Sequence, residues 1–468
     1  MPKRLVIQGV TLVPMGENRE VIPEATVVAE DGLIVEVTGP RGYRPDRETE
    51  VIDARGRLVI PGLVNAHTHL YQVLLRGVWD DLPLLPWLGR IYQVGEVLEP
   101  EDCYLGALLG SLESIGSGVT TVCDHFFLNR TPDHAAATIA GMQRAGIRAV
   151  LARTSMDAGE LPPPGVKEEP DVVLERIAEL LERYQNELSD GLLGIMVGPN
   201  TPPINASSEL IQKVGDFAAR NGLRVSAHVA EGRDIVRQCR EKHGGGVVDY
   251  LDSLGLVGPN AVFAHCVHLS SEEIETLAAR GASVAHNPVS NCLLGDGIAP
   301  VAELLAAGVN VALGTDGAAS NHTQDMFEVM KLTSLLQRVA SGRPEIIDPY
   351  QVLRLATAGG ARALGLEDIV GTIERGKRAD IAIVDPCRAP HGAAMHNVFT
   401  HLVHTLKAAD VETTIVDGQV LFRHGVFVCQ DAGAVAAEAQ RRAEDLVRRV
   451  EEFSRQVEYF SREVNQVG

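Results

Sequence analysis

The sequence predicts an α/β fold in which a (β/α)8 TIM-like barrel is joined to a small β-sandwich domain formed from both termini. Short apolar segments alternate with longer amphipathic segments from residue 58 to residue 313, which is the pattern of βα units around a parallel sheet. Both ends of the chain instead carry short β-type segments separated by turn sequences. Histidine or aspartate follows several of the apolar segments, at the end of the strands where such barrels carry their active sites.

The two termini are expected to build one domain together. Its β-type segments are 5–10, 26–29, 33–38 and 50–52 near the N-terminus, and 371–373, 381–384, 411–416 and 418–422 near the C-terminus. The sequence Val416-Asp417-Gly418-Gln419 is typical of a hairpin turn. We therefore expect residues 1–60 and 365–430 to form the β-sandwich domain, residues 61–364 the barrel, and residues 431–468 a C-terminal helix.

Eight apolar segments are expected to form the strands of the barrel. They are 58–64, 119–124, 148–152, 192–197, 224–228, 262–265, 283–286 and 310–313. The amphipathic segments between them include 101–115, 132–145, 172–187, 208–221, 272–280 and 301–307. From Val435 to Phe460, apolar residues recur in steps of three and four, which predicts a helix laid on the body or on a neighbouring subunit.

Composition excludes several classes of partner. Lys and Arg total 42 against 62 Asp and Glu, a formal net charge of −20, which disfavours binding to nucleic acid phosphates and to anionic membranes. Charged residues or histidines interrupt every apolar run before it is long enough to cross a bilayer, and the N-terminus lacks a signal-like apolar core. The seven cysteines contain no CxxC pair, which is typical of a reducing compartment. We expect a cytoplasmic protein.

A pair of histidines at the end of the first barrel strand suggests a metal site. His67 and His69 are two residues apart, so in a strand both rings lie on one face and Thr68 lies on the other. Later predicted strands end in His228, His265 and Asp316. Because the carboxyl ends of barrel strands meet at one face, and imidazole and carboxylate both bind zinc or iron, these residues together predict a metal centre.

Five motifs resemble those of the amidohydrolase superfamily, and more closely its aminohydrolase branch. They are PGLVNAHTH (61–69), HVAE (228–231), AHCV (264–267), SVAHNPVSN (283–291) and GTDGAASN (314–321). The branch includes methylthioadenosine/S-adenosylhomocysteine deaminases, triazine chlorohydrolases and guanine-type deaminases. The resemblance covers nearly the whole chain, including the terminal segments IDARG (52–56) and GKRAD (376–380).

The resemblance implies a set of metal ligands and catalytic residues. The ligands are His67, His69, His228 and Asp316, and the catalytic residues are Glu231 as proton shuttle, His265 on the metal-bound water, and Asp316. A divalent metal lowers the pKa of bound water from about 15.7 to about 7, which gives hydroxide for attack on the ring carbon. Members with two metals bridge them by a lysine from the fourth strand, and segment 192–197 has none. We therefore expect one divalent metal per subunit, zinc first and iron as the alternative.

The resemblance also suggests which residues bind the substrate. Segment 77–99 is similar to a loop that covers the substrate in the deaminases, so Trp87 is expected to stack on the ring and Glu96 to accept hydrogen bonds from ribose hydroxyls. The other candidates are His125, Arg148, Arg153 and Asn200. Arg148 is also compatible with a helix–strand salt bridge. Asn200 stands where the adenosine-type enzymes carry histidine, and the sequence from Arg153 to Met156 is closer to triazine hydrolases and oxidised-purine deaminases.

These expectations define the function predicted from sequence. The protein is expected to be a metal-dependent deaminase of an amino-substituted N-heterocycle, a purine or adenosine-type nucleoside first, that releases ammonia. The alternatives are an s-triazine or guanine-type amino- or chlorohydrolase and, from another class, a non-catalytic barrel used as a scaffold or binding protein. The expected partner is a small heterocyclic substrate, and the predicted C-terminal helix favours a homo-oligomer.

Overall fold

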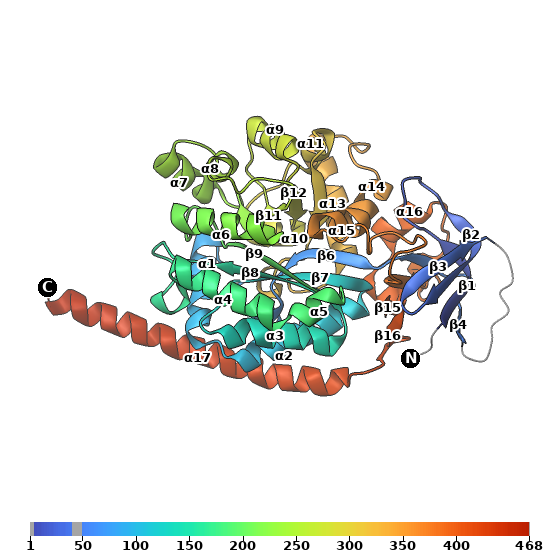
Figure 1. Cartoon of the computed structure of the whole chain (residues 1–468), viewed down its shortest axis with the longest axis horizontal. Coiled ribbons are helices and arrows are strands. Elements are labelled where there is room, and N and C mark those ends of the chain that lie inside the picture. Colours follow the sequence, from blue (N-terminus) through green and yellow to red (C-terminus); the bar gives the residue numbers. More distant parts are fainter. Residues whose placement is uncertain (1–3, 40–48, 468) are drawn as a thin grey trace.

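The computed structural model describes residues 4–39 and 49–467, with side chains to residue 457 (Figure 1). Two sheets organise the chain. An eight-stranded parallel sheet forms the barrel, and a nine-stranded mixed sheet contains strands from both ends of the sequence. In Figure 1 the barrel lies in the centre and the terminal strands β1 to β4 lie at one side. The predicted fold class is confirmed by this arrangement.

The barrel strands follow one another around the sheet in chain order. They are β6 (Leu63–Thr68), β7 (Val119–Phe126), β8 (Arg148–Ser155), β9 (Leu193–Pro199), β10 (Arg224–Val229), β11 (Ala261–His265), β12 (Ser283–His286) and β13 (Asn310–Leu313). Each pair of neighbours in this order is parallel. The amide of Asp316, just after β13, donates to the carbonyl of His67 in β6 at 3.0 Å, so the last and first strands meet at the end that carries the histidines.

Helices connect the strands and surround the barrel (Figure 1). They are α2 (Pro100–Gly116), α3 (Pro132–Ala145), α4 (Pro170–Arg183), α5 (Gln185–Ser189), α6 (Ser208–Asn221), α7 (Arg233–His243), α8 (Val247–Ser253), α9 (Ser271–Arg280), α10 (Pro288–Leu293), α11 (Val301–Ala306), α12 (Ala318–Asn321), α13 (Met326–Ser341), α14 (Pro349–Arg354) and α15 (Gly360–Leu364). Local sequence sets their ends. Before α9, for example, the Ser270 side chain accepts from the amide of Glu273 while the Glu273 carboxylate accepts from the amide of Ser270, and Gly281 ends the helix with φ +73°.

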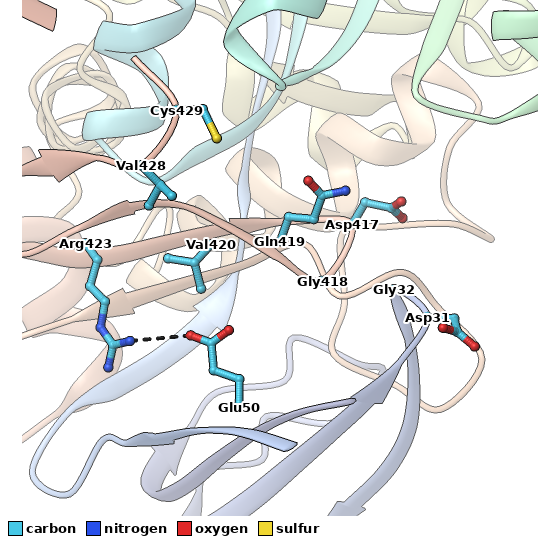
Figure 2. A pocket seen from close by; sticks show the side chains of 10 residues that line it. All are labelled: Asp31, Gly32, Glu50, Asp417, Gly418, Gln419, Val420, Arg423, Val428 and Cys429. Carbon is cyan, nitrogen blue, oxygen red and sulfur yellow. Dashed lines mark ion pairs between the residues drawn. The ribbon is translucent and has the colours of Figure 1, made fainter. Parts of the chain in front are cut away.

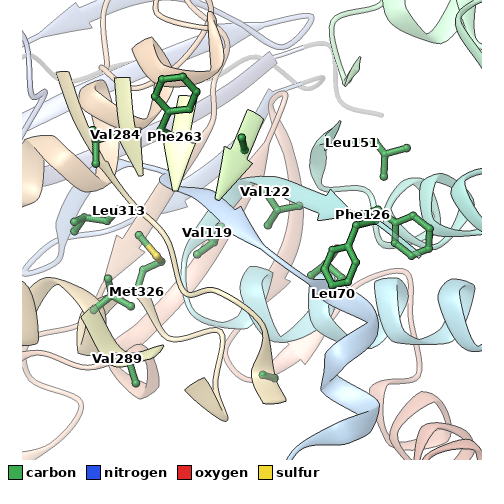
Figure 3. Packing of buried hydrophobic residues seen from close by; sticks show 14 of the residues in the cluster. Leu70, Val119, Val122, Phe126, Leu151, Phe263, Val284, Val289, Leu313 and Met326 are labelled. Carbon is green, nitrogen blue, oxygen red and sulfur yellow. The ribbon is translucent and has the colours of Figure 1, made fainter. Parts of the chain in front are cut away.

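Residue size differs between the two faces of the barrel sheet. The interior contains mostly small or medium side chains, among them Val64, Ala66, Cys123, Val150, Ala152, Met196, Val262, Ala285 and Ala312. The outer face carries larger residues that pack on the helices, and Figure 3 shows Phe126, Leu151, Phe263 and Leu313 among them. This alternation along each strand fixes which side chains enter the barrel and which turn toward the helices.

The second sheet joins the two ends of the chain. Its strands are β1 (Arg4–Leu12), β2 (Ile22–Glu30), β3 (Leu33–Thr38), β4 (Thr49–Asp53), β5 (Leu58–Pro61), β14 (Ile381–Val384), β15 (Val411–Val416), β16 (Gln419–Arg423) and β17 (Val426–Phe427). Strand β5 pairs with both β1 and β14, which ties the termini together. The chain passes into the barrel at Gly62, where a Cβ atom would lie 2.1 Å from the Thr120 hydroxyl, so only glycine fits.

Three local predictions were wrong. Segment 58–64, expected as one barrel strand, is divided at Gly62, because β5 pairs with β1 and β14 in the terminal sheet and only β6 belongs to the barrel. Residues 371–373 are not a strand, because Gly371 has φ +91° and is packed against Ala361. Most of the segment expected as a loop at 77–99 is helix α1 (Leu84–Val97), whose buried residues Leu84, Trp87, Leu88, Ile91 and Tyr92 recur at the spacing of a helix face. The domain boundaries at residues 60, 364 and 430 stay a prediction.

The C-terminal helix α17 (Ala432–Val467) lies along α1 and α2 on the outside of the molecule (Figure 1). Its residues Ala439, Leu446 and Val450 are buried, whereas the side chain of Phe460 lies outside the described residues. Two arginines, Arg442 and Arg449, form ion pairs with the fully buried Asp102 of α2 at 2.7 and 2.8 Å. No helix among the described residues is long and apolar enough to span a membrane.

Candidate metal centre and active site

Four side chains from three parts of the barrel converge at the carboxyl ends of the strands. The Nε2 atom of His69 lies 3.1 Å from Asp316 Oδ1 and 3.3 Å from His228 Nε2, and His67 Nε2 lies 3.5 Å from the same Asp316 oxygen. All four residues are buried. The ligand atoms of His67, His69 and His228 lie within 4.8 Å of one another, and so do those of His67, His265 and Asp316.

The opposite sides of these side chains are held by hydrogen bonds. His69 Nδ1 donates to the carbonyl oxygen of His125 at 2.6 Å, and His228 Nδ1 donates to the carbonyl oxygen of Asn200 at 3.0 Å. Because a carbonyl only accepts, Nδ1 carries the proton in both rings, and Nε2 presents its lone pair to the centre. Asp316 Oδ2 accepts from the Ser320 hydroxyl at 3.0 Å, which leaves Oδ1 facing the histidines.

The cluster fits a divalent cation. His67 Nε2 and Asp316 Oδ1 are buried without a hydrogen-bond partner among the described residues. Burial lowers the pKa of His67 to about 4, so its ring is neutral at physiological pH. Burial alone would raise the pKa of Asp316, but contact with His67 and His69 holds it well below its usual value. Three imidazoles and one carboxylate, of which His69, His228 and Asp316 are already oriented from behind by hydrogen bonds, are a ligand set for zinc or a similar metal.

Glu231 and His265 lie beside these ligands. Burial, followed by the nearby charge of Asp316, raises the pKa of the Glu231 carboxyl well above its usual value, which favours its protonated form. Its Oε1 atom lies 3.5 Å from His265 Nδ1. The same Nδ1 donates to the side-chain oxygen of Asn291 at 2.8 Å, which fixes the orientation of the His265 ring. The site thus combines a carboxyl that favours its protonated form with an oriented imidazole.

A cavity opens over this centre. Residues from seven segments line it: His69, Gln72, Trp87, Leu88, Phe127, Asn200, Thr201, His228, Glu231, His265 and Asp316. Its volume is about 20 Å³, which is room for about one water molecule. Trp87 and Leu88 cover it from α1, so a heterocycle enters only when these side chains move. The indole NH of Trp87 and Oε1 of Gln72 have no hydrogen-bond partner among the described residues, so both polar atoms are free for a ligand.

Two of the six residues predicted to bind substrate line this cavity, namely Trp87 and Asn200. His125 is buried beneath the ligands instead, with its ring centroid 4.2 Å from that of His228 and Nε2 3.3 Å from Asn200 Oδ1. Its carbonyl oxygen holds His69. His125 therefore supports the ligands from below and does not line the cavity.

The other three predicted residues lie away from the cavity. Arg148 stands at the first residue of β8, at the far end of the barrel, where it forms a buried bidentate ion pair with Asp380 at 2.9 Å. Arg153 points outward between strand and helices and pairs with Glu168. Glu96 accepts from the amide of Gly165 at 2.8 Å. The structure therefore corrects the placement of all three residues.

Among known protein families, the amidohydrolase family matches this chain, and its family model covers residues 58–421. This chain belongs to the amidohydrolase family.

Curated relatives resemble this amidohydrolase over nearly its whole length. A 5-methylthioadenosine/S-adenosylhomocysteine deaminase from Pelotomaculum thermopropionicum is 41% identical over 442 residues, which cover 94% of this chain and 98% of the relative. A 5'-deoxyadenosine deaminase from Methanothermobacter thermautotrophicus is 40% identical over 425 residues, covering 89% and 95%. These findings confirm the predicted family and the prediction of a hydrolase acting on carbon–nitrogen bonds of cyclic amidines.

Solved structures resemble this amidohydrolase in fold. An adenosine deaminase from Xanthomonas campestris with bound zinc superposes with a TM-score of 0.87 at 31% identity, covering 95% of this chain and 98% of that one. Atrazine chlorohydrolase TrzN from Arthrobacter aurescens, complexed with zinc, superposes with a TM-score of 0.87 at 28% identity, covering 94% and 100%. Together with the cluster of histidines and aspartate, these neighbours support a divalent metal in this amidohydrolase.

Sequence reasoning missed several residues that shape this site. Gln72, Leu88, Phe127 and Thr201 line the cavity, and Asn291 orients His265. Asn291 ends the motif at 283–291, which was a signal that this position matters. The others come from a short helix, from α1 and from strand-end loops, where nothing in the spacing of residues marks a side chain as facing the metal.

A second, larger cavity lies in the terminal part of this amidohydrolase (Figure 2). It measures about 530 Å³ and lies between the turn at Asp31 and Gly32 and the hairpin at Asp417 and Gly418. Its wall includes an ion pair between Arg423 and Glu50 at 3.5 Å. None of its ten lining residues lines the cavity over the histidines. It is therefore not part of the metal centre.

Proposed function

We propose that this chain is a metal-dependent deaminase of an adenosine-type nucleoside, which replaces the exocyclic amino group of the ring with oxygen from water and releases ammonia. One observation carries the proposal: a buried Glu231, whose burial raises its pKa and favours its protonated form, stands beside a cluster of three histidines and one aspartate. Deamination needs both a metal-activated nucleophile and an acid that protonates the ring. Relatives about 40% identical to this chain are named as deaminases of adenosine derivatives, which supports this choice of substrate.

His67, His69, His228 and Asp316 would hold the metal. When bound, a divalent metal makes a nucleophile of water at neutral pH and stabilises negative charge on oxygen. Zinc is the proposed ion, because three imidazoles and one carboxylate are an ordinary zinc ligand set and two solved relatives contain zinc. Iron is the alternative, since the same ligands bind it.

The residues around the ligands supply the proton transfers. Glu231 gives its proton to the ring nitrogen next to the carbon that is attacked, which makes that carbon more electrophilic. Asp316 takes the proton of the attacking water, and the oriented His265 holds that water by a hydrogen bond. The proton on Asp316 then passes to the amino group, which leaves as ammonia when the carbon–nitrogen bond breaks, and the remaining hydroxyl proton returns to Glu231. The amino group leaves as ammonia only after it has gained a proton, whereas a halide leaves without one. A buried acid therefore suits deamination better than loss of halide.

The side chains that line the cavity suit a flat ring once Trp87 and Leu88 have moved to admit it. Trp87, Leu88 and Phe127 provide apolar surface, and Asn200, Thr201 and Gln72 provide polar contacts. The runner-up within the class is hydrolysis of an s-triazine, supported by the TrzN fold at a lower identity of 28%. A non-catalytic scaffold is disfavoured, because the full ligand set and Glu231 are present.

Ammonia release tests the proposal. The zinc-loaded protein is assayed with adenosine, 5'-deoxyadenosine, methylthioadenosine, guanine, a pterin and two triazines, and its metal content is measured. We expect turnover of at least one adenosine derivative, loss of turnover with a chelator and recovery with zinc. Turnover of triazines alone would establish the runner-up. A metal-free protein that retains activity would overturn the metal-dependent mechanism.

We further propose a homo-oligomer in the cytoplasm. Val450 is the last buried residue among the described side chains of α17, and the apolar spacing of the sequence continues beyond it to Phe460, which supports a helix that also contacts a second subunit. No disulfide forms among the described residues, which include all seven cysteines, and free thiols are typical of a reducing compartment. Light scattering on the purified protein tests the oligomer; a monomer at micromolar concentration would refute it.

A further inference from the structure

The buried carboxyl group of Asp296 lies outside the predicted site and has no role in the mechanism proposed above. Asp296 lies in the loop between α10 and α11, and its backbone is held at both ends: its amide donates to the carbonyl of Asn291 at 2.9 Å, and its carbonyl accepts from Nε2 of His268 at 2.7 Å. The residue is 8% exposed, and its Oδ2 atom has no hydrogen-bond partner among the described residues. A rigid backbone thus presents an unsatisfied acid in the interior, which calls for an explanation.

Asp296 stands next to the proton shuttle and beneath α1. A Cβ atom built on Gly232, the residue after Glu231, would lie 3.7 Å from Asp296 Oδ1 and 2.7 Å from Cδ2 of Leu84. Leu84 and Trp87 are one helical turn apart and both are buried. Asp296 does not itself line the cavity, so a displacement of the Leu84 and Trp87 side chains that admits a heterocycle would also be needed to open a path to its carboxyl.

The charges around Asp296 fit a carboxyl that accepts a hydrogen bond from an N–H group of a ligand. Burial first, and then the neighbouring carboxyls of Glu231 and Asp316, raise the pKa of Asp296 to about 8, with His265 acting in the opposite direction. No ion pair with Asp296 occurs in the part of the chain that the structure describes. An acid left unpaired in the interior destabilises the empty protein, and a ligand N–H that bonds to it removes that cost.

We propose that Asp296 determines specificity by binding an N–H donor on the heterocycle, at the ring position next to the nitrogen that Glu231 protonates. This inference rests on the proposed function. The metal ligands fix the carbon that is attacked, Glu231 fixes the adjacent ring nitrogen, and the carboxyl beside Gly232 comes next along the same edge of the ring. The preferred substrate class is therefore a purine nucleoside with a second amino group at that ring position. A nucleoside that carries only hydrogen at the same position should be the poorer substrate.

The test compares two rings that differ only in this amino group. The zinc-loaded wild type and the variants Asp296→Asn and Asp296→Ala are assayed with 2,6-diaminopurine riboside and with adenosine. We expect wild-type kcat/KM to favour the diamino ring by about tenfold to a hundredfold, since an unsatisfied buried group disfavours the ring that lacks the donor. Asp296→Ala should reduce this ratio to about one, through a fall in kcat/KM for the diamino ring. A wild-type ratio of one or less, or an unchanged ratio in both variants, would overturn the inference.

Binding separates this inference from the proposed function. If neither nucleoside is deaminated, the proposed function fails, and calorimetry on the zinc-loaded protein then tests Asp296 alone. Tighter binding of the diamino ring that disappears in Asp296→Asn supports the inference, and equal affinities in the wild type refute it. Because asparagine has nearly the shape of aspartate, this variant also keeps the test valid if the alanine variant fails to fold.

Discussion

Replacement of Glu231 by glutamine isolates proton transfer from every other function of the site. Glutamine has the size of glutamate and, like the protonated carboxyl, carries no charge. Because burial raises the pKa of Glu231 and so favours its neutral form, a neutral glutamine is a close substitute for it in the ground state. Glu231 is also outside the groups of residues whose ligand atoms converge. Metal content and substrate affinity should therefore be retained, and only the transfer of the proton should be lost.

The size of the loss follows from the enclosure of this residue. General acid catalysis contributes about 10²- to 10⁴-fold to a rate. Glu231 is 5% exposed and faces a cavity of about 20 Å³, so bulk water has little access to replace the missing acid. We therefore expect kcat to fall by about 10³- to 10⁴-fold, which corresponds to about 4–5.5 kcal/mol of barrier at about 1.36 kcal/mol for each tenfold.

Steady-state ammonia release and metal analysis measure both quantities. We expect a large fall in kcat, a KM within about threefold of the wild-type value, and one metal per chain. Glu273→Gln is the matched control, since Glu273 is 1% exposed and accepts from the amides of Val248 and Ser270, away from the cavity. That variant should lower the unfolding temperature and leave kcat unchanged. A Glu231→Gln variant that keeps more than about a tenth of the wild-type kcat, or one that loses its metal, would refute the assigned role.

Three further perturbations test the metal centre, the buried ion pair between Arg148 and Asp380, and the contact of α17 with Asp102. Asp316→Ala removes the only carboxylate of the cluster, so metal content should fall by about tenfold or more; full occupancy by mass spectrometry would contradict its place as a ligand. Arg148→Ala leaves the buried Asp380 carboxylate unpaired and should cost about 3–5 kcal/mol in unfolding free energy, with KM unchanged; a raised KM in a stably folded protein would restore the substrate role. Arg449→Ala should release part of α17 from Asp102, seen as faster amide exchange in that helix; unchanged exchange would show that Arg442 suffices.

Two residues predicted to bind substrate, Arg148 and Arg153, lie away from the cavity for a related reason. Arg148 begins its strand, and barrel active sites lie at strand ends, so its position in the strand already placed it at the wrong face. Arg153 is at the correct end, but Val150 and Ala152 point into the barrel and the alternation turns Arg153 toward the helices. In both cases a motif was matched without the strand register that decides where its side chain points.

The sequence by itself determined the fold and the members of the metal cluster. Strand periodicity requires His67 and His69 to share a face, and parallel strands require residues at their carboxyl ends to meet, so identity and spacing suffice. Only the tertiary structure decided what surrounds that cluster. The closure of α1 over the cavity, the orientation of His265 by Asn291 and the position of Asp296 beside Glu231 depend on packing between segments far apart in the chain. Local patterns carry no information about such contacts, because the free energy that selects them arises only when the segments meet.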